Sequence, residues 1–459
     1  MASPKRASRL LAATAGLAAI FAANSAHAIS LIRDTEIEEM IREDSEGVLR
    51  AHGLNPDSVN FYLVGNKEIN AFVVGGQNIF IHTGLITESE TPNQLLGVIA
   101  HEAGHISGGH LIRQGDMMRA GLTPFLLTMG LGLAAALAGE GGAAGALMAS
   151  SQYFGALSVL SYSRVQEAAA DQSAVTALEA AGKSSKGLVE FFDNYRYQEI
   201  FSDQKRFQFF RSHPLSSDRI EALRRRAAEQ SHYDTPDTEE DVAQHKLMQA
   251  KLEAFMNPPA QTFVKWGERD TSFLARYSRA IAYYKSGEAD RALTMIEALI
   301  AEEPENPYLW ELKGQVLFEN ARAAEAVPAH KRSIELKPDA PLLRINYAQA
   351  LIALEDKGRL DEAIQNLGRA LTEERDNAYA WRLLSQAFEG KGQPGQARLA
   401  AAEENYALGK LAEARAFAMR AREHLSEGTP DWRRATDIVL ASNPSDSDLK
   451  ELARETRGG

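Results

Sequence analysis

The segment His101-Glu102-Ala103-Gly104-His105 carries two histidines and a glutamate at a spacing that indicates metal binding and proton transfer more clearly than any other segment of this chain. On a helix, residues at positions i and i+4 share a face, so both imidazoles can bind one metal ion. Glu102 projects beside that face, where a carboxylate can accept a proton from water. The alternative is a surface helix with two ordinary histidines. The uncharged residues around the motif favour the metal, because a buried helix does not carry two histidines and a glutamate without compensation.

A third ligand must come from another segment, since a catalytic zinc typically has three protein ligands and one open position. The best candidate is Glu167, in an alanine-rich segment that predicts closely packed helices. Asp171 follows one helical turn later and could accept a hydrogen bond from a ligand imidazole. Acidic pairs at this spacing are also common on solvated faces, so this assignment depends on the preceding H-E-x-x-H motif.

The order of these motifs resembles the M48 zinc metallopeptidases. The blocks that carry the resemblance span roughly residues 30 to 225 and are Asn70-Ala71-Phe72, His101-Glu102-Ala103-Gly104-His105, Tyr162-Ser163-Arg164, Glu167 with Asp171, and Ser212-His213-Pro214-Leu215 with Arg219. The resemblance implies that His101, His105 and Glu167 bind one Zn²⁺ per chain. It also implies that Glu102 is the catalytic base and that Asp171 supports a ligand histidine. The chain contains no cysteine, so no disulfide of a relative can be present here.

His213 precedes Pro214, which disfavours helical geometry and places the imidazole on a loop. Three roles are open for it: a fourth zinc ligand that gates the site, a donor to the tetrahedral oxyanion, or a surface histidine. The resemblance favours the first two, and we favour the gate. Arg219 could steady the oxyanion, contact the substrate or pair with a nearby acid. His110 falls off the ligand face by its spacing from His105 and is expected to support the site or the fold.

The N-terminal residues predict export. Lys5, Arg6 and Arg9 precede the apolar stretch 10–23, and Ala26-His27-Ala28 is a small-x-small cleavage site. The apolar stretch is too short to span a bilayer comfortably. We therefore expect residues 1–28 to be a cleaved signal peptide and the mature chain to act in the periplasm. No cysteine follows the apolar stretch, which argues against a lipoprotein anchor.

Length and charge limit the remaining possibilities. A chain of 459 residues is expected to form two domains or more. Its net charge of -12 leaves no basic stripe to neutralise phosphates, so nucleic acid is excluded as a partner. The same charge opposes electrostatic attachment to an anionic membrane surface.

Upstream of the metal motif the chain predicts a small α/β layer. Residues 34–53 repeat apolar side chains at helical spacing, and strands are predicted at 59–64, 71–74 and 79–82. An edge strand beside a zinc helix could bind an extended substrate through backbone hydrogen bonds, although Asn70-Ala71-Phe72 could equally be a plain strand entry. We expect residues 29–228 to form a mostly helical, α+β, zincin-like metalloprotease domain with a small β-sheet.

A glycine- and alanine-rich stretch at 121–160 carries a single charge, at Glu140. Gly139, Gly141 and Gly142 flank that charge and predict a break between two apolar helices. Small residues allow such helices to pack closely. We expect a hairpin packed on the protease domain, in peripheral contact with lipid or an unfolded client rather than spanning the membrane.

The second half of the chain predicts helical repeats after an acidic, proline-interrupted linker at 229–243. Small residues recur at two positions of each unit: Ala280, Gly314 and Ala348 at the first, and Ala292, Ala326 and Ala363 at the second. Pro304 and Pro338 close two of the units, and this pattern resembles tetratricopeptide repeats. We expect an all-α solenoid at 244–445, whose last units share helices, and a C-terminal tail at 446–459.

Two functions are compatible with this layout. The first is a zinc metalloendopeptidase that degrades misfolded or stalled envelope and outer-membrane proteins, with repeats that bind partners. By resemblance to periplasmic M48 proteases with such repeats, these partners include unfolded or misassembled outer-membrane proteins and the β-barrel assembly machinery. The second is a chaperone or binding scaffold for outer-membrane protein assembly, in which the metal site is closed or little used.

Overall fold

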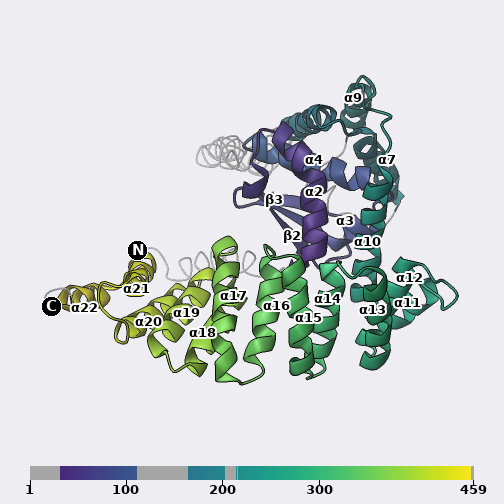
Figure 1. The fold of residues 1–459 in the computed structure, drawn as a ribbon. Helices are drawn as coiled ribbons and strands as arrows, with labels where there is room; N and C mark the ends of the chain where they lie inside the picture. Colours follow the sequence, from purple (N-terminus) through teal and green to yellow (C-terminus); the bar gives the residue numbers. More distant parts are fainter. Residues whose placement is uncertain (1–30, 111–163, 202–212, 214–215, 456–459) are drawn as a thin grey trace, which may run out of the picture.

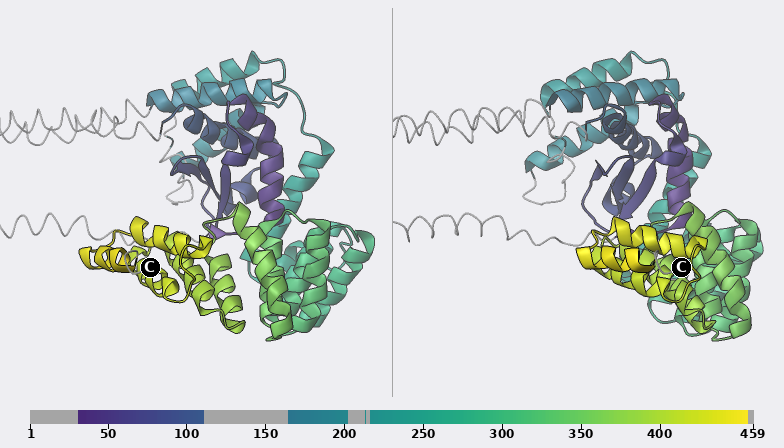
Figure 2. Two further views of the ribbon diagram at one scale, coloured as in Figure 1. Left: turned by 60° about the vertical axis from the view of Figure 1, so that its left-hand side comes forward. Right: turned by 90° about the vertical axis from the view of Figure 1, so that its left-hand side faces the viewer.

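The computed structural model describes residues 31–110, 164–201, 213 and 216–455 (Figure 1). The predicted signal peptide and the predicted hairpin at 121–160 lie outside these residues. An N-terminal part with a small sheet stands over a helical solenoid, which the two further views also show (Figure 2). The predicted fold class, an α+β part followed by an all-α repeat solenoid, is confirmed. Within the described residues, no helix has the length and apolar character needed to cross a membrane.

The N-terminal part contains one four-stranded sheet with helices around it. Its elements are β1 (Leu31–Ile32), α2 (Thr35–Ala51), η1 (Pro56–Ser58), β2 (Asn60–Val64), β3 (Ala71–Val74), β4 (Asn78–His82), α3 (Thr83–Glu88), α4 (Pro92–Ser107), the helical residues 164–180, α7 (Lys186–Phe201) and α9 (Ser217–Ala228). The strand order is β1-β2-β4-β3; β2 and β4 run parallel, and the other neighbours antiparallel. The three strands expected from the sequence are present within one residue of their predicted bounds.

The sheet buries one face. Alternate residues of β2, β3 and β4 are buried and join the apolar core that α2, α4 and α7 complete; on the strands they are Phe61, Leu63, Ala71, Val73, Ile79 and Ile81. This alternation follows from the period of two in a strand. The helix α4 packs against β3, so the helix that carries the metal motif lies beside the last strand of the sheet.

The solenoid is a row of antiparallel helices (Figure 1). They are α10 (Glu239–Met256), α11 (Pro259–Lys265), α12 (Phe273–Lys285), α13 (Ala289–Glu302), α14 (Pro307–Glu319), α15 (Ala323–Leu336), α16 (Pro341–Ile352), η2 (Lys357–Arg359), α17 (Leu360–Glu373), α18 (Ala378–Gly390), α19 (Pro394–Ala407), α20 (Leu411–Arg422), α21 (Pro430–Ala441) and α22 (Asp446–Glu455). The small residues Ala280 and Gly314 lie on the first helices of successive pairs, as the repeat pattern predicts. Helix α19 packs against both α18 and α20, as α15 and α17 also pack against both of their neighbours.

Helix α10 joins the two parts. It begins at Glu239, within the range that the sequence predicts as a linker. Met248 and Leu252 belong to the core of the N-terminal part, whereas Ala254 belongs to the first core of the solenoid. The two parts therefore share this helix, whose buried side chains contribute to both cores.

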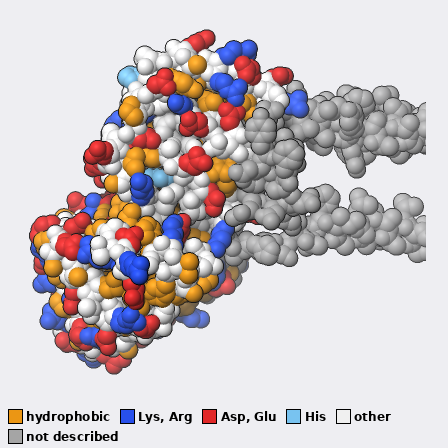
Figure 3. Space-filling view, turned by 90° about the vertical axis from the view of Figure 1, so that its right-hand side faces the viewer, with side chains coloured by type: hydrophobic (Ala, Val, Ile, Leu, Met, Phe, Trp, Pro, Cys, Tyr) orange, Lys and Arg blue, Asp and Glu red, His pale blue; other side chains and the backbone are white. Residues whose placement is uncertain are grey.

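Charged residues close this junction. Lys251, only 5% exposed, donates hydrogen bonds to Asp34 (2.8 Å) and to Glu36 (2.9 Å), which is 3% exposed. Further along the solenoid, Arg33 donates to Glu374 at 2.7 Å. On the face drawn in Figure 3, basic and acidic side chains are interspersed over both parts.

A partly open cavity of about 400 Å³ also lies at the junction and is lined in part by Asp34, Lys251 and Glu311. Burial raises the pKa of the Glu311 carboxyl to about 8 from an ordinary value of 4.5, and Lys251 opposes this shift. The folded chain therefore holds a proton between pH 4.5 and 8 that the unfolded chain releases, so stability falls as the pH rises through this window.

We expect Glu311→Gln to remove most of the loss of stability at high pH. Glutamine is neutral, and its side-chain oxygen can still accept the hydrogen bond from Asn346 (3.0 Å). The expected gain in unfolding free energy at pH 8.5 is about 2 kcal/mol, with little change at pH 5. Chemical denaturation at the two pH values measures it. Glu305→Gln, at an exposed position, is the control and should change neither value. Equal pH dependence in the Glu311 variant and the unmodified protein would contradict the assignment.

Candidate metal centre

Helix α4 is held in position by its N-terminal cap and by close packing against a neighbouring helix. The Thr91 side chain accepts a hydrogen bond from the backbone N–H of Gln94, and Pro92 opens the helix, where a missing N–H costs nothing. At Gly104 a Cβ would lie 2.9 Å from the backbone oxygen of Ala170. This glycine therefore allows the helical residues 164–180, which carry Glu167, to approach α4 closely.

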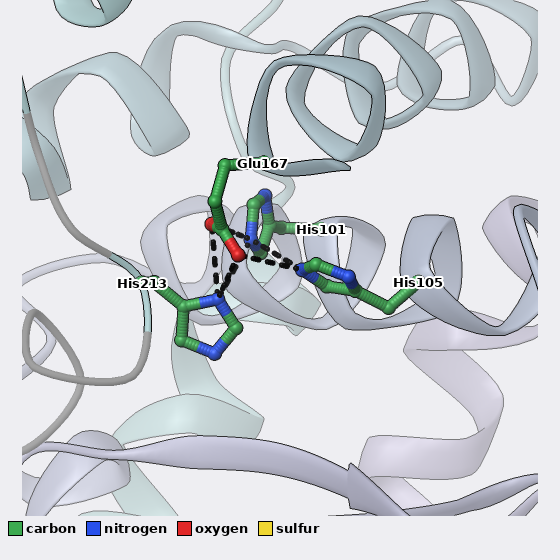
Figure 4. Close-up of side chains that lie close together, drawn as sticks. All are labelled: His101, His105, Glu167 and His213. Atoms are coloured by element: carbon green, nitrogen blue, oxygen red, sulfur yellow. Dashed lines mark hydrogen bonds and ion pairs between the residues drawn. The ribbon is translucent and has the colours of Figure 1, made fainter. Parts of the chain in front are cut away.

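Four side chains from three segments converge beside α4 (Figure 4): His101 and His105 from α4, Glu167 from residues 164–180, and His213. The Nε2 atom of His101 lies 3.2 Å from Nε2 of His105, 3.3 Å from Nδ1 of His213 and 3.3 Å from Oε2 of Glu167. Both carboxylate oxygens of Glu167 lie 3.1 Å from Nδ1 of His213. His101, Glu167 and His213 are buried and His105 is partly buried.

The donor atoms fit a tetrahedral metal ion. Ligands held at about 2.0–2.1 Å from zinc in a tetrahedron lie roughly 3.3–3.4 Å from one another. Five of the six separations between the donor groups, at 3.1–3.4 Å, match these edges, and one donor atom from each residue lies within 4.8 Å of the others. Three imidazole nitrogens and a carboxylate are a donor set that zinc and other divalent transition metals accept.

Each imidazole has its far nitrogen beside an acceptor, so that its near nitrogen presents a lone pair to the cluster. Nδ1 of His101 lies 2.9 Å from Oδ1 of Asp171, and Nδ1 of His105 lies 2.8 Å from Nδ1 of His110. Nε2 of His213 lies 3.3 Å from Oε1 of Glu102. Burial lowers the pKa of His105 to about 2, so this imidazole is neutral and able to bind a metal. Against its own burial, Asp171 and Glu167 raise the pKa of His101 to about 9 in the metal-free chain, so metal binding there would release a proton.

Glu102 lies next to the cluster but is not one of the four converging ligands. Its side chain is 1% exposed, and burial raises the pKa of its carboxyl above the ordinary value. A carboxylate in this environment is a stronger base than one in water. The structure thus brings together six of the residues that the sequence singled out, which are His101, Glu102, His105, Glu167, Asp171 and His213.

Arg219 lies behind the cluster. Its guanidinium donates to both carboxylate oxygens of Asp171, at 2.5 and 2.8 Å, and its Nη1 lies 3.0 Å from Oε2 of Glu167. It also donates to the backbone oxygen of His213 at 3.4 Å and covers the ring of Phe192, which contacts His101 edge-on. Of the three roles that the sequence left open for Arg219, the structure shows its pairing with nearby acids. The contact of His110 with His105 could be anticipated only as a general supporting role, since the chain turns at Gly109 before His110.

The chain is similar to known proteins over both parts. Residues 32–227 match the family described as peptidase family M48, and residues 289–405 match the cytochrome c-type biogenesis protein H TPR domain. The chain is 27% identical to the "Beta-barrel assembly-enhancing protease" of Escherichia coli strain K12 over 367 residues, which cover 77% of this chain and 72% of that protein. It is 31% identical to "Metalloprotease LoiP" of the same strain over 177 residues, 38% of this chain and 65% of that protein.

Among solved structures, the TPR protein YrrB is similar to 39% of this chain and 91% of its own, with a TM-score of 0.32 and 20% identity. The M48 family is a family of metallopeptidases, and this implies a metal at the four-residue cluster. Residues 32–227 are therefore a peptidase family M48 domain, and a tetratricopeptide-repeat domain follows it.

Proposed function

We propose that the protein is a zinc-dependent endopeptidase, and the observation that carries this proposal is the tetrahedral spacing of the four donor groups beside Glu102. His101, His105 and Glu167 are the proposed permanent ligands. Zinc bound there would supply Lewis acidity, which lowers the pKa of water and polarises a peptide carbonyl. Asp171 holds His101 in the tautomer that binds metal, and Arg219 positions Asp171 and Glu167.

Glu102 is the proposed general base. It accepts a proton from the attacking water and passes it to the leaving amine, so one side chain serves both transfers. Its Oε1 atom lies 3.3 Å from Nε2 of His213, which in the proposed resting state competes with water for this carboxylate. His213 therefore has two effects in this arrangement: it fills the fourth position of the cluster and engages the base.

The substrate is proposed to bind along β3. Within the described residues, β3 pairs with β4 on one side only, so its other edge can accept an extended chain by backbone hydrogen bonds. The strand packs against α4, which brings such a chain beside the cluster.

The proposed place of action is the periplasm, because the N-terminal sequence has the pattern of a cleaved signal peptide. Relatives named for β-barrel assembly support outer-membrane proteins in assembly as clients, with the β-barrel assembly machinery as a partner of the repeats. A solenoid of paired helices offers an extended surface for such partners.

Metal removal tests the function directly. Dialysis against a chelator is expected to abolish digestion of unfolded casein, and one equivalent of Zn²⁺ per chain should restore it. Metal analysis by mass spectrometry before and after dialysis supplies the stoichiometry. Digestion that continues in metal-free protein would contradict the proposal, provided that a Glu167→Ala sample purified alongside shows no contaminating protease.

His213→Ala is expected to raise the rate of casein digestion or self-cleavage while zinc content stays at one per chain. The reason is that the substitution opens the fourth position of the cluster and frees Glu102. If His213 instead donates to the oxyanion, turnover should fall roughly 100- to 1000-fold. Steady-state rates on casein decide between the two, and an unchanged rate would contradict both.

A scaffold function is the second candidate, and the contact between His213 and the cluster is the observation that favours it. A site that stays closed would leave partner binding as the activity. If the unmodified protein and His213→Ala both retain zinc and bind unfolded outer-membrane proteins but neither digests casein, the scaffold is supported over the peptidase.

A further inference from the structure

The face of the sheet opposite the core carries a row of aromatic rings. Tyr62 on β2, Phe80 on β4 and Phe72 on β3 are all half-buried and alternate with buried core residues. The rings of Tyr62 and Phe80 stack with centroids 5.0 Å apart, and those of Phe80 and Phe72 with centroids 5.2 Å apart and planes within 4° of parallel. The peptidase chemistry proposed above does not use this row.

The two ends of the row differ. Beside Tyr62 lie Arg33 and Glu374, which join the sheet to the solenoid through a hydrogen bond of 2.7 Å. Phe72 lies at the other end, on the strand whose outer edge no described strand covers. Among the described residues, the open end of the row is therefore the one at Phe72.

The backbone of β3 defines how a further strand would add. The N–H of His82 donates to the carbonyl of Asn70, which it faces directly, so Asn70, Phe72 and Val74 form the hydrogen-bonded pairs with β4. Ala71 and Val73 then direct their backbone groups outward. A chain that pairs with them places one residue opposite Phe72, and its side chain lies on the same face as the Phe72 ring.

We propose that this aromatic row is a specificity site: the substrate residue opposite Phe72 is aromatic or large and apolar, and its side chain extends the stack by one ring. This inference rests on the proposed function and names the substrate class of the same site. Neighbouring strands lie about 4.8 Å apart, which matches the centroid spacings of the existing stack.

The neighbours of that substrate residue point to the other face, toward α4, where the metal cluster and Glu102 lie. The strand that fits is therefore amphipathic, with aromatic or apolar side chains on one side and polar side chains on the other. Strands of outer-membrane β-barrels alternate in this way and are rich in aromatic residues near their ends. An unfolded barrel strand is the occupant to which the geometry points.

The test compares two peptides of equal composition and charge, cleaved by the full-length zinc protein. Both contain a single scissile segment flanked by an alternating sequence; in the first a phenylalanine occupies every second position, and in the second the phenylalanines are clustered at one end. We expect kcat/KM to be about 10-fold higher for the alternating peptide, as an added aromatic pair and its buried area predict. The difference should lie in KM, because the stack forms equally in the ground and transition states.

Phe72→Ala is expected to reduce this 10-fold preference to about 1, and Phe72→Leu, which preserves apolar volume, to an intermediate value. Tyr406→Ala, an exposed aromatic on the solenoid, is the matched control and should keep the preference. A wild-type ratio near 1, or a preference that survives in both Phe72 variants, overturns the inference while leaving the peptidase intact. Failure of the wild type to cleave casein and both peptides would instead overturn the proposed function.

Discussion

Replacing Glu102 with glutamine is expected to lower the rate of proteolysis by roughly 100- to 10,000-fold, the usual contribution of a positioned general base. Glutamine has the shape of glutamate but cannot accept a proton at neutral pH. The site should otherwise keep its structure, because glutamine has the size of the glutamate that lies 3.3 Å from Nε2 of His213 and the four converging ligands are untouched. Zinc content should stay at one per chain, measured together with the rate on casein.

Glu229→Gln, at an exposed position after α9, is the matched control for this measurement and should change neither rate nor metal content. Retained digestion by the Glu102→Gln protein, free of contaminating protease, would remove Glu102 from the base role. Loss of zinc together with activity would mean that Glu102 contributes to metal binding instead.

The sequence predicted the parts of the site that follow from helical spacing. His101 and His105 share a face of α4 because they are four residues apart, and Glu167 and Asp171 do so on the next helix for the same reason. The spacing within each pair is local. The pairing of the two helices needed the close approach at Gly104, which the sequence indicated only through its small residues.

Contacts that depend on tertiary placement could not be read from the sequence in the same way. Arg219 was left with several roles, since nothing local says that its guanidinium meets Asp171, 48 residues earlier. The aromatic row was also missed. The alternation in β2, β3 and β4 was visible, but stacking of Tyr62 on Phe80 requires the parallel pairing of β2 with β4, which skips β3 along the chain.

The prediction from composition differs most from the structure at the boundary between the two parts. The acidic, proline-interrupted segment after Arg226 has the composition of a linker, and its first residues do connect α9 to α10. Helix α10 nevertheless contributes to both cores, because Met248 and Leu252 pack into the core of the N-terminal part and Ala254 packs into the first core of the solenoid. The two parts are expected to depend on each other for stability.

Lys251→Met measures that dependence, and we expect it to lower the unfolding free energy by about 3–5 kcal/mol. Methionine preserves the apolar length of the side chain but leaves Asp34 and Glu36 without their cation in a buried setting. Chemical denaturation gives the change. Lys265→Met removes an exposed lysine that pairs with Glu253, and as the control it should cost no more than about 1 kcal/mol.

A second variant separates lost charge pairing from lost packing. Lys251→Met combined with Glu36→Gln removes one unpaired carboxylate along with the lysine, so it should recover part of the lost stability if the buried charge is the cause. No recovery would assign the effect to packing around α10. Recovery would mean that the lysine of α10 holds the N-terminal acidic segment in place.

A fragment ending at Arg226 would then keep Glu36 but lose Lys251, its buried partner. This predicts that the M48 domain requires α10, and with it the start of the solenoid, in order to fold.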